Sequence, residues 1–196
     1  MKKILLCFSF FLFVANAMAQ DKEITFAGKL SEAAIALTKQ TVVYDPSYFS
    51  IPYPNGDVPA DKGVCTDVVI RAYRKLSIDL QKEVHQDMKA NFGKYPKTWG
   101  MKRTDRNIDH RRVPNLMVFF ARYGTVCPTS DNSEDYLAGD IVCWRLSSGL
   151  THIGLVVDKK SADGKRNQIV HNIGQGQVIE DVLFSYKIIG HYRYKK

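Results

Sequence analysis

Cysteine is scarce in this sequence, which has four in 196 residues, and Cys7 lies in an apolar leader. The other three, Cys65, Cys127 and Cys143, are an odd number, so at least one thiol is unpaired if the protein is exported to an oxidising compartment. If Cys127 and Cys143 form a disulfide, Cys65 is the free thiol. The alternative, which we favour, is that both are small buried side chains.

Several other signals are missing. The sequence contains no HExxH or CxxC spacing, so we expect no metal site and no cofactor. It has no basic stripe interleaved with aromatic residues, so nucleic acid is not an expected partner. After residue 20 no segment has the run of about 20 apolar residues that spans a bilayer, so we expect no stable membrane insertion. The hydrophobic content of 45% argues against disorder.

The first 19 residues have the pattern of a secretory signal peptide. Two lysines precede an apolar run at residues 4–14, and Ala-Met-Ala at residues 17–19 offers a cleavage site. The run is too short to span a bilayer. We therefore expect residues 20–196 to form a single domain in the periplasm or outside the cell, with a length sufficient for its own core.

The period of the apolar residues changes along the chain. A period of 3.6 predicts helices over residues 26–40, 65–76 and 79–88, and another that opens at Pro114 and closes at Gly124. Prolines and glycines predict irregular structure over residues 45–63, and residues 91–112 are also expected to be irregular. Alternation then predicts strands over residues 140–146, 152–158, 167–173, 177–183 and 188–194. Helices followed by consecutive strands indicate an α+β fold with a largely antiparallel sheet of five to six strands.

One cysteine and two histidines have the arrangement of a thiol hydrolase. Cys65 stands at a predicted helix start, where the helix N-terminus and a nearby imidazolium lower a thiol's pKa. We interpret Cys65 as the nucleophile and His152, on a later strand, as the base. His171 on the following strand is the group expected to orient the base, with Asn172 and Asp158 as alternatives.

Further side chains are candidates for contacts with substrate. The backbone N–H of Cys65 and the hydroxyl of Tyr53, in the preceding loop, are candidate donors to an oxyanion. Asp67 either holds a substrate amine or is an acid favoured in the first turn of a helix. Arg111 and Arg112 either clamp a substrate carboxylate or pair with nearby acids.

These segments resemble the NlpC-type cell-wall peptidases, which are papain-like. Residues 53–56 (Tyr-Pro-Asn-Gly) are similar to that family's glycine-bearing loop, and residues 64–67 (Val-Cys-Thr-Asp) to its nucleophile block. Residues 139–142 and 150–157 are similar to its glycine-aspartate strand and its histidine strand. The resemblance implies an NlpC-type fold with Cys65, His152 and His171 as nucleophile, base and orienting group, and with Tyr53 positioning the oxyanion.

Residues 84–116 are foreign to ordinary members of that family. With them, the chain resembles over most of its length an exported bacterial family described as a domain of unknown function. The distant relatives mostly cut amide bonds in peptidoglycan stem peptides. The resemblance therefore implies an exported cysteine hydrolase acting on peptidoglycan peptide or a related envelope substrate. The alternatives are a non-catalytic envelope-binding module on the same fold and a thiol acyltransferase.

Overall fold

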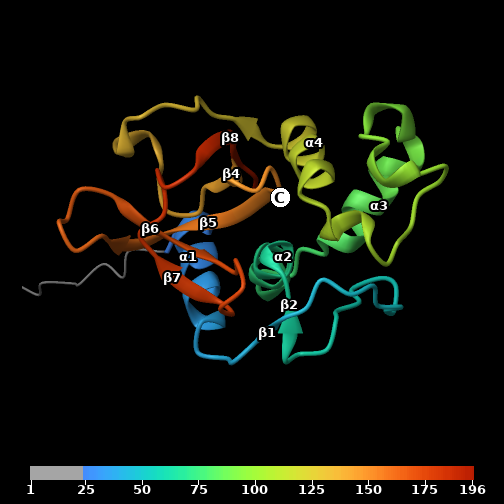
Figure 1. The fold of residues 1–196 in the computed structure, drawn as a ribbon, viewed down its shortest axis with the longest axis horizontal. Helices are drawn as coiled ribbons and strands as arrows, with labels where there is room; N and C mark the ends of the chain where they lie inside the picture. The colour runs from blue at the N-terminus through green and yellow to red at the C-terminus, as the bar shows by residue number, and fades with distance from the viewer. Residues whose placement is uncertain (1–23) are drawn as a thin grey trace, which may run out of the picture.

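The computed structural model describes residues 24–196, and the predicted leader lies outside them. Helices pack on one six-stranded antiparallel sheet, as Figure 1 shows, so the predicted α+β fold is confirmed. The helices are α1 (Phe26–Leu37), α2 (Cys65–Lys75), α3 (Leu80–Ala90) and α4 (Val113–Tyr123). None of the helices within residues 24–196 combines the length and the apolar character needed to cross a membrane.

The sheet has the strand order β3-β8-β4-β5-β6-β7. Five of its strands correspond to the predicted ones: β4 (Ile141–Arg145), β5 (Thr151–Lys160), β6 (Asn167–His171), β7 (Val178–Glu180) and β8 (Lys187–Arg193). The sixth, β3 (Thr125–Val126), pairs with β8 at one edge. Two residues are too few to show an alternating pattern, which is why the sequence gives no sign of β3.

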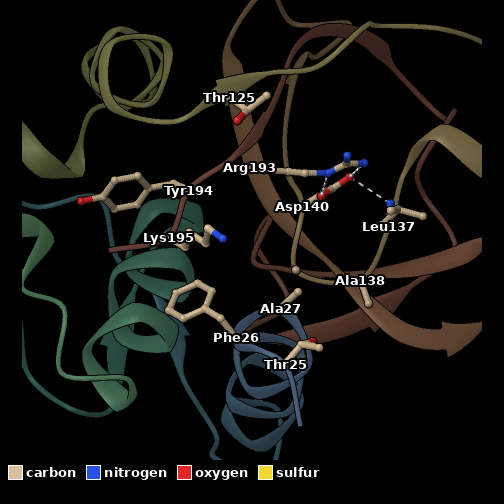
Figure 2. Close-up of a pocket in the computed structure, with 11 residues that line it drawn as sticks. Thr25, Phe26, Ala27, Thr125, Leu137, Ala138, Asp140, Arg193, Tyr194 and Lys195 are labelled. Atoms are coloured by element: carbon tan, nitrogen blue, oxygen red, sulfur yellow. Dashed lines mark hydrogen bonds and ion pairs between the residues drawn. The ribbon is translucent and has the colours of Figure 1, made fainter. Parts of the chain in front are cut away.

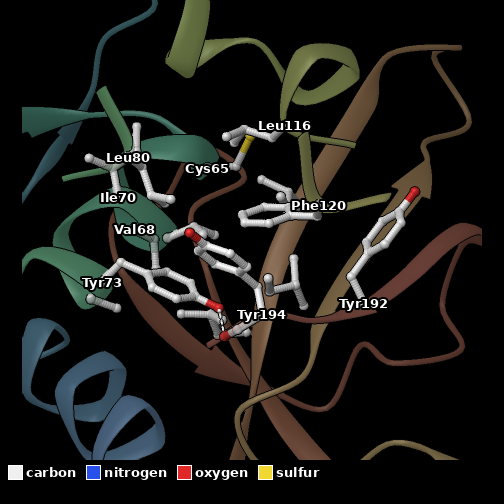
Figure 3. Packing of buried hydrophobic residues seen from close by; sticks show 14 of the residues in the cluster. Cys65, Val68, Ile70, Tyr73, Leu80, Leu116, Phe120, Tyr192 and Tyr194 are labelled. Atoms are coloured by element: carbon white, nitrogen blue, oxygen red, sulfur yellow. Dashed lines mark hydrogen bonds between the residues drawn. The ribbon is translucent and has the colours of Figure 1, made fainter. Parts of the chain in front are cut away.

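Alternation along the strands divides the apolar residues between the two faces of the sheet. On β4, Ile141 and Cys143 belong to the main core with α1, α2 and α4, whereas Val142 and Trp144 belong to a smaller cluster with Tyr136 and other residues. Figure 3 shows part of the main core, to which Cys65 belongs together with aromatic residues such as Tyr73 and Phe120. The helices therefore cover one face, and loops cover the other.

Local capping fixes the helix ends. The Thr25 hydroxyl accepts a hydrogen bond from the N–H of Gly28 at 3.1 Å, and Asp79 accepts one from Lys82 at 3.1 Å. Helix α1 ends at Leu37, three residues before the predicted end. The hydroxyl of Thr38 donates to the carbonyl of Ile35 at 2.8 Å, which satisfies one of the last carbonyls of the helix.

Two irregular regions flank the start of α2. In the first, β1 (Val43–Tyr44) and β2 (Lys62–Gly63) form a short parallel pair that fixes the chain just before Cys65. The second, between α3 and α4, contains three 3-10 turns: η1 (Phe92–Lys94), η2 (Thr98–Gly100) and η3 (Asp109–Arg111). Figure 1 shows α3 and this second region on the side of α2 away from the sheet.

Candidate active site

Cys65 is the first residue of α2, and the turn that holds it is fixed by Asp67. The backbone N–H of Val64 donates to Oδ2 of Asp67 at 2.7 Å. The Cys65 side chain is 8% exposed. Burial raises the pKa of Cys65 to about 12, opposed by the backbone N–H groups of Ile153, Thr66 and Cys65 itself. The expected lowering of the thiol pKa is therefore not observed, because desolvation outweighs the helix N-terminus, and the sulfur rests as a thiol.

Strands β5 and β6 bring the two predicted histidines into contact. His152 Nε2 lies 2.9 Å from His171 Nδ1, and the ring centroids are 5.1 Å apart. His171 Nε2 lies 2.8 Å from a carboxylate oxygen of Glu180 on β7. Burial lowers the pKa of His152 to about 3 and also lowers the pKa of His171, so both rings are neutral.

These contacts determine which nitrogen carries each proton. The Glu180 carboxylate only accepts hydrogen bonds, so His171 carries its proton on Nε2 and its Nδ1 is an acceptor. His152 must then donate from Nε2, which leaves the lone pair of its Nδ1 free. Glu180 thus sets the tautomer in which Nδ1 of His152 can act as a base.

The sulfur approaches β5 next to His152. The Ile153 N–H that affects the thiol pKa belongs to the residue directly after His152. The His152 ring lies beside Trp144, with ring centroids 5.8 Å apart, on the loop-covered face of the sheet. Within residues 24–196 no hydrogen bond joins Cys65 to His152, which is 3% exposed. The structure thus brings the thiol to the backbone N–H of the residue after the predicted base, and Cys65 and His152 are both nearly closed off from solvent.

The two alternatives to His171 have other contacts. The Asn172 side chain donates to the Gly63 carbonyl at 3.2 Å and accepts from the Gly174 N–H at 3.1 Å, so it fastens the end of β6 to β2. Asp158 is exposed on β5, and its backbone N–H donates to the Ser31 hydroxyl at 2.8 Å. His171 is therefore the residue of the three that hydrogen-bonds to His152.

Asp67 and Arg111 are partners of each other. The Arg111 guanidinium donates to both carboxylate oxygens of Asp67, at 2.9 and 3.0 Å, and both side chains are buried. A further bond runs from Arg111 to the Ser47 carbonyl at 3.2 Å. These contacts fit the alternative of an arginine paired with a nearby acid. Within residues 24–196 Arg112 has no acidic partner, and it lines a separate hollow.

A tyrosine other than the predicted one lies near the thiol. The Tyr53 ring packs edge-on against His85, with centroids 5.3 Å apart. Burial raises the pKa of Tyr44, at the end of β1, and Cys65 and Asp67 raise it further when they are ionised. Tyr44 is therefore close enough to Cys65 for an electrostatic effect, whereas the Tyr53 ring contacts α3.

Cys143 lies on β4 opposite Ile153 and is close enough to Cys65 for an electrostatic effect, whereas a separate hollow lies away from the candidate residues. Cys127 and Cys143 are buried free thiols, so the described chain contains no disulfide. A hollow of about 400 Å³ lies between the start of α1 and the last residues of the chain, where Arg193 binds Asp140 at 2.6 Å (Figure 2). Its lining includes neither Cys65 nor the two histidines. It is therefore not the site at which a thiol would act.

Sequence comparison assigns the chain to a family. The family model described as "Domain of unknown function (DUF1287)" matches residues 31–194. The chain belongs to the DUF1287 family. It is also similar to the "Uncharacterized protein YijF" of Escherichia coli (strain K12), with 56% identity over 154 residues, which are 79% of this chain and 75% of YijF. The predicted resemblance to a family of unknown function is confirmed.

Solved structures extend the comparison to the fold of this DUF1287 member. An N-acetylmuramoyl-L-alanine amidase from Bacteroides uniformis is similar with a TM-score of 0.52 and 14% identity, over 87% of this chain and 99% of the amidase. NlpC1 from Trichomonas vaginalis is 20% identical with a TM-score of 0.47, over 89% of this chain. The chain spans about half of NlpC1, 47% of its length. The chain therefore shares its fold with this amidase.

Two residues of this DUF1287 site escaped the sequence analysis. Glu180 lies on a three-residue strand, nine positions after His171, and is recognisable only through the pairing of β6 with β7. Tyr44 precedes Cys65 by 21 positions, and the pairing of β1 with β2 brings the two segments together. A tyrosine in a short β-prone run was visible in the sequence, but nothing in the sequence connects it to the cysteine.

Proposed function

We propose that this DUF1287 protein is an exported cysteine hydrolase that cleaves an amide bond in peptidoglycan stem peptide or a related envelope substrate. Cys65 would be the nucleophile, His152 the base and His171 the group that orients it. The observation that carries the proposal is the hydrogen-bonded series from His152 through His171 to Glu180, which leaves Nδ1 of His152 unprotonated beside the strand residue that the Cys65 sulfur approaches. The fold shared with a cell-wall amidase supports the substrate class.

The resting protonation states define the first step. Because the thiol pKa is raised and that of His152 is lowered, the pair starts as thiol and neutral imidazole. The sulfur attacks the amide carbonyl carbon while Nδ1 of His152 accepts the thiol proton. The C–N bond then breaks, and the imidazolium gives that proton to the leaving amine. Water attacks the resulting thioester and releases the acid and the thiol.

Hydrogen-bond donors for the oxyanion lie at the start of α2. The backbone N–H groups of Cys65 and Thr66 are directed close enough to the sulfur to lower the pKa of the thiol. The Tyr44 hydroxyl is the nearby side-chain donor. In a nearly closed site such donors stabilise developing charge more strongly than they do in water.

The decisive experiment compares the wild-type protein with Cys65→Ala on purified sacculi and on a synthetic stem peptide. We expect new amine termini with the wild-type protein and none with Cys65→Ala. Cys127→Ala is the matched control, because it removes another buried free thiol outside the site and should retain turnover. Turnover that survives in Cys65→Ala contradicts the proposal.

The closed state of the site favours a second candidate, a non-catalytic binding module on the same fold. Cys65 and His152 are 8% and 3% exposed, and the described chain contains no hydrogen bond between them. A module would bind sacculi equally well as wild type and as Cys65→Ala, without products. Acyl transfer, the third reading, would instead join the substrate acyl group to an added amine, which mass spectrometry of the products detects.

Export is also proposed, on the basis of the leader at residues 1–19. Cleavage after Ala19 would give a mature protein that begins at Gln20. N-terminal sequencing of protein recovered from the periplasm or the medium tests this. Full-length protein confined to the cytoplasm would contradict it.

A further inference from the structure

The arginines of this chain mostly pair with acids, and the exceptions gather in one place. Six of the ten arginines in the sequence are in ion pairs with carboxylates. Of the other four, Arg103, Arg106 and Arg112 line a single hollow of about 580 Å³. Within residues 24–196 none of these three guanidinium groups is in an ion pair, so positive charge exceeds negative charge in the lining of the hollow.

The one acid in the wall of this hollow is already engaged. Asp105 accepts a hydrogen bond from the Tyr48 hydroxyl at 3.1 Å and another from the backbone N–H of Asn107 at 2.9 Å. Three guanidinium groups therefore face a single carboxylate that already accepts hydrogen bonds from its neighbours. A concave wall with one sign of charge focuses the electric field and attracts an anion.

Aromatic rings hold two of the arginines in place. The Arg112 guanidinium lies 4.4 Å from the centroid of the Trp99 ring, and that of Arg106 lies 5.8 Å from the Tyr53 ring. Stacking on a ring face fixes the planar guanidinium and leaves its edges free. Nη1 of Arg112 donates to Sδ of Met101 at 2.6 Å, so its other N–H groups are the ones available to an oxyanion. The wall also contains His85, whose Nδ1 is buried and has no hydrogen-bond partner within the described residues.

The turn η3 lies between the hollow and the candidate nucleophile and contacts both. On one side of this turn, the Arg111 carbonyl accepts a hydrogen bond from the Thr66 hydroxyl at 3.2 Å, next to Cys65. On the other side, Arg112 is part of the hollow. The chain at Ser47 and Tyr48 joins the two sides, because Ser47 binds Arg111 and Tyr48 lines the hollow.

We propose that the hollow lined by Arg103, Arg106 and Arg112 binds a carboxylate of an acidic peptide and so holds the substrate beside the thiol. This inference rests on the proposed hydrolase function and names its substrate class, a peptide with free carboxylates. Paired N–H groups of a guanidinium match the two oxygens of a carboxylate, which is the geometry that an arginine cluster supplies. The proposal also assigns a role to the segment between α3 and α4, which is foreign to ordinary NlpC-type peptidases.

The test separates binding from turnover by using Cys65→Ala protein. Calorimetry would compare a synthetic stem peptide with the same peptide after amidation of its carboxylates. Arg106→Gln and Arg112→Gln would be added singly, with Lys159→Gln as the control, because this exposed lysine on β5 removes the same charge outside the hollow. Thermal melting confirms that each variant is folded. Because Arg106 is exposed, Arg106→Gln should fold and can test the site even if Arg112→Gln is unstable.

We expect amidation and each arginine substitution to weaken binding by about tenfold, the scale of a charge-assisted hydrogen bond, and Lys159→Gln to have no effect. Equal affinity for the two peptides, no binding of either, or arginine variants that match the control would overturn the inference. Charge-dependent binding without hydrolysis by the wild-type protein would keep this site and reject the hydrolase. If the arginine substitutions, made in the wild-type background, leave the rate of hydrolysis unchanged, the hydrolase proposal stands and the carboxylate site is rejected.

Discussion

At the scale of single residues, the carboxylate of Glu180 determines what the two imidazoles can do. It lies on the far side of His171 from His152, and its effect passes through the proton positions of both rings. Glu180 is therefore a positioning residue, and its removal would allow His171 to adopt the other tautomer. The proton of His152 would then no longer be held on Nε2, and Nδ1 would be protonated in a larger share of the molecules.

We predict that Glu180→Ala lowers kcat by roughly 10- to 100-fold, the range seen when an active histidine loses its second hydrogen-bond partner. Glu180→Gln should stay close to wild type, because its amide oxygen accepts the same hydrogen bond. Steady-state kinetics on the stem peptide measure both, and rescue by glutamine distinguishes positioning from simple loss of stability. Equal losses in the two variants would contradict the proton assignment.

Asp67 and Arg111 form a structural pair, so their substitution should affect stability before it affects turnover. We predict that Asp67→Asn lowers the free energy of unfolding by about 3–5 kcal/mol, because it leaves a buried guanidinium without its counter-charge. Urea denaturation measures the change. Arg166→Gln breaks an exposed pair with Asp181 and should cost about 1 kcal/mol or less. An equal effect of the two substitutions would refute the assignment.

At the scale of elements, Gly154 allows β6 to approach β5 where the histidines meet. A Cβ at Gly154 would lie 2.7 Å from Cγ2 of Ile169, 3.0 Å from the Val170 carbonyl oxygen and 3.2 Å from Cβ of His171. Two of these three contacts are with atoms that cannot rotate away. Any side chain at this position must therefore push the strand that carries His171 away from His152.

We predict that Gly154→Ala lowers the free energy of unfolding by about 1–3 kcal/mol, the usual cost of overpacking, and lowers kcat more than it raises KM. Gly93→Ala is the matched control, because a Cβ at Gly93 meets nothing within 4 Å. Chemical denaturation and steady-state kinetics measure the two effects. Wild-type kinetics in Gly154→Ala would show that the spacing of β5 and β6 is not critical.

The same scale shows what the sequence can and cannot predict. The long periodic elements, the Asp79 cap and the Gly124 end of α4 follow from local patterns, and these elements place Cys65, His152 and His171 correctly within the fold. Tyr44, Glu180 and the partner of Asp67 depend on pairings between short segments remote in the sequence. The pKa of Cys65 depends on burial by several elements at once, which no local pattern contains.

At the scale of the whole molecule, buried histidines couple stability to pH, above all His110 and His152. Burial lowers the pKa of both His110 and His152 to about 3, whereas an unfolded histidine titrates near 6.5. Below pH 6.5 the unfolded chain therefore binds protons that the folded chain does not, and stability falls as the pH falls. Asp109 opposes this below about pH 6, since burial raises its pKa to about 6 and the folded chain takes up that proton first.

We predict that lowering the pH from 7.5 to 5 costs on the order of 2 kcal/mol of stability for each buried histidine, with Asp109 offsetting part of the total. His110→Gln should reduce the pH dependence by about the contribution of one histidine, because glutamine does not titrate. Urea midpoints at the two pH values measure this. An unchanged slope in His110→Gln would show that His110 is protonated in the folded protein.

The strand that carries Glu180 forms one border of the sheet. Strand β7 has three residues and, among the described residues, is paired on one side only, with β6. Short border strands open by fraying more readily than central ones, so amide hydrogen exchange should be faster at Ile179 than at Val156. Each opening event separates the carboxylate from the imidazole behind the base. The fraction of molecules competent for catalysis would then depend on how often β7 is paired with β6. This holds even though the nucleophile and the base remain in the rigid interior.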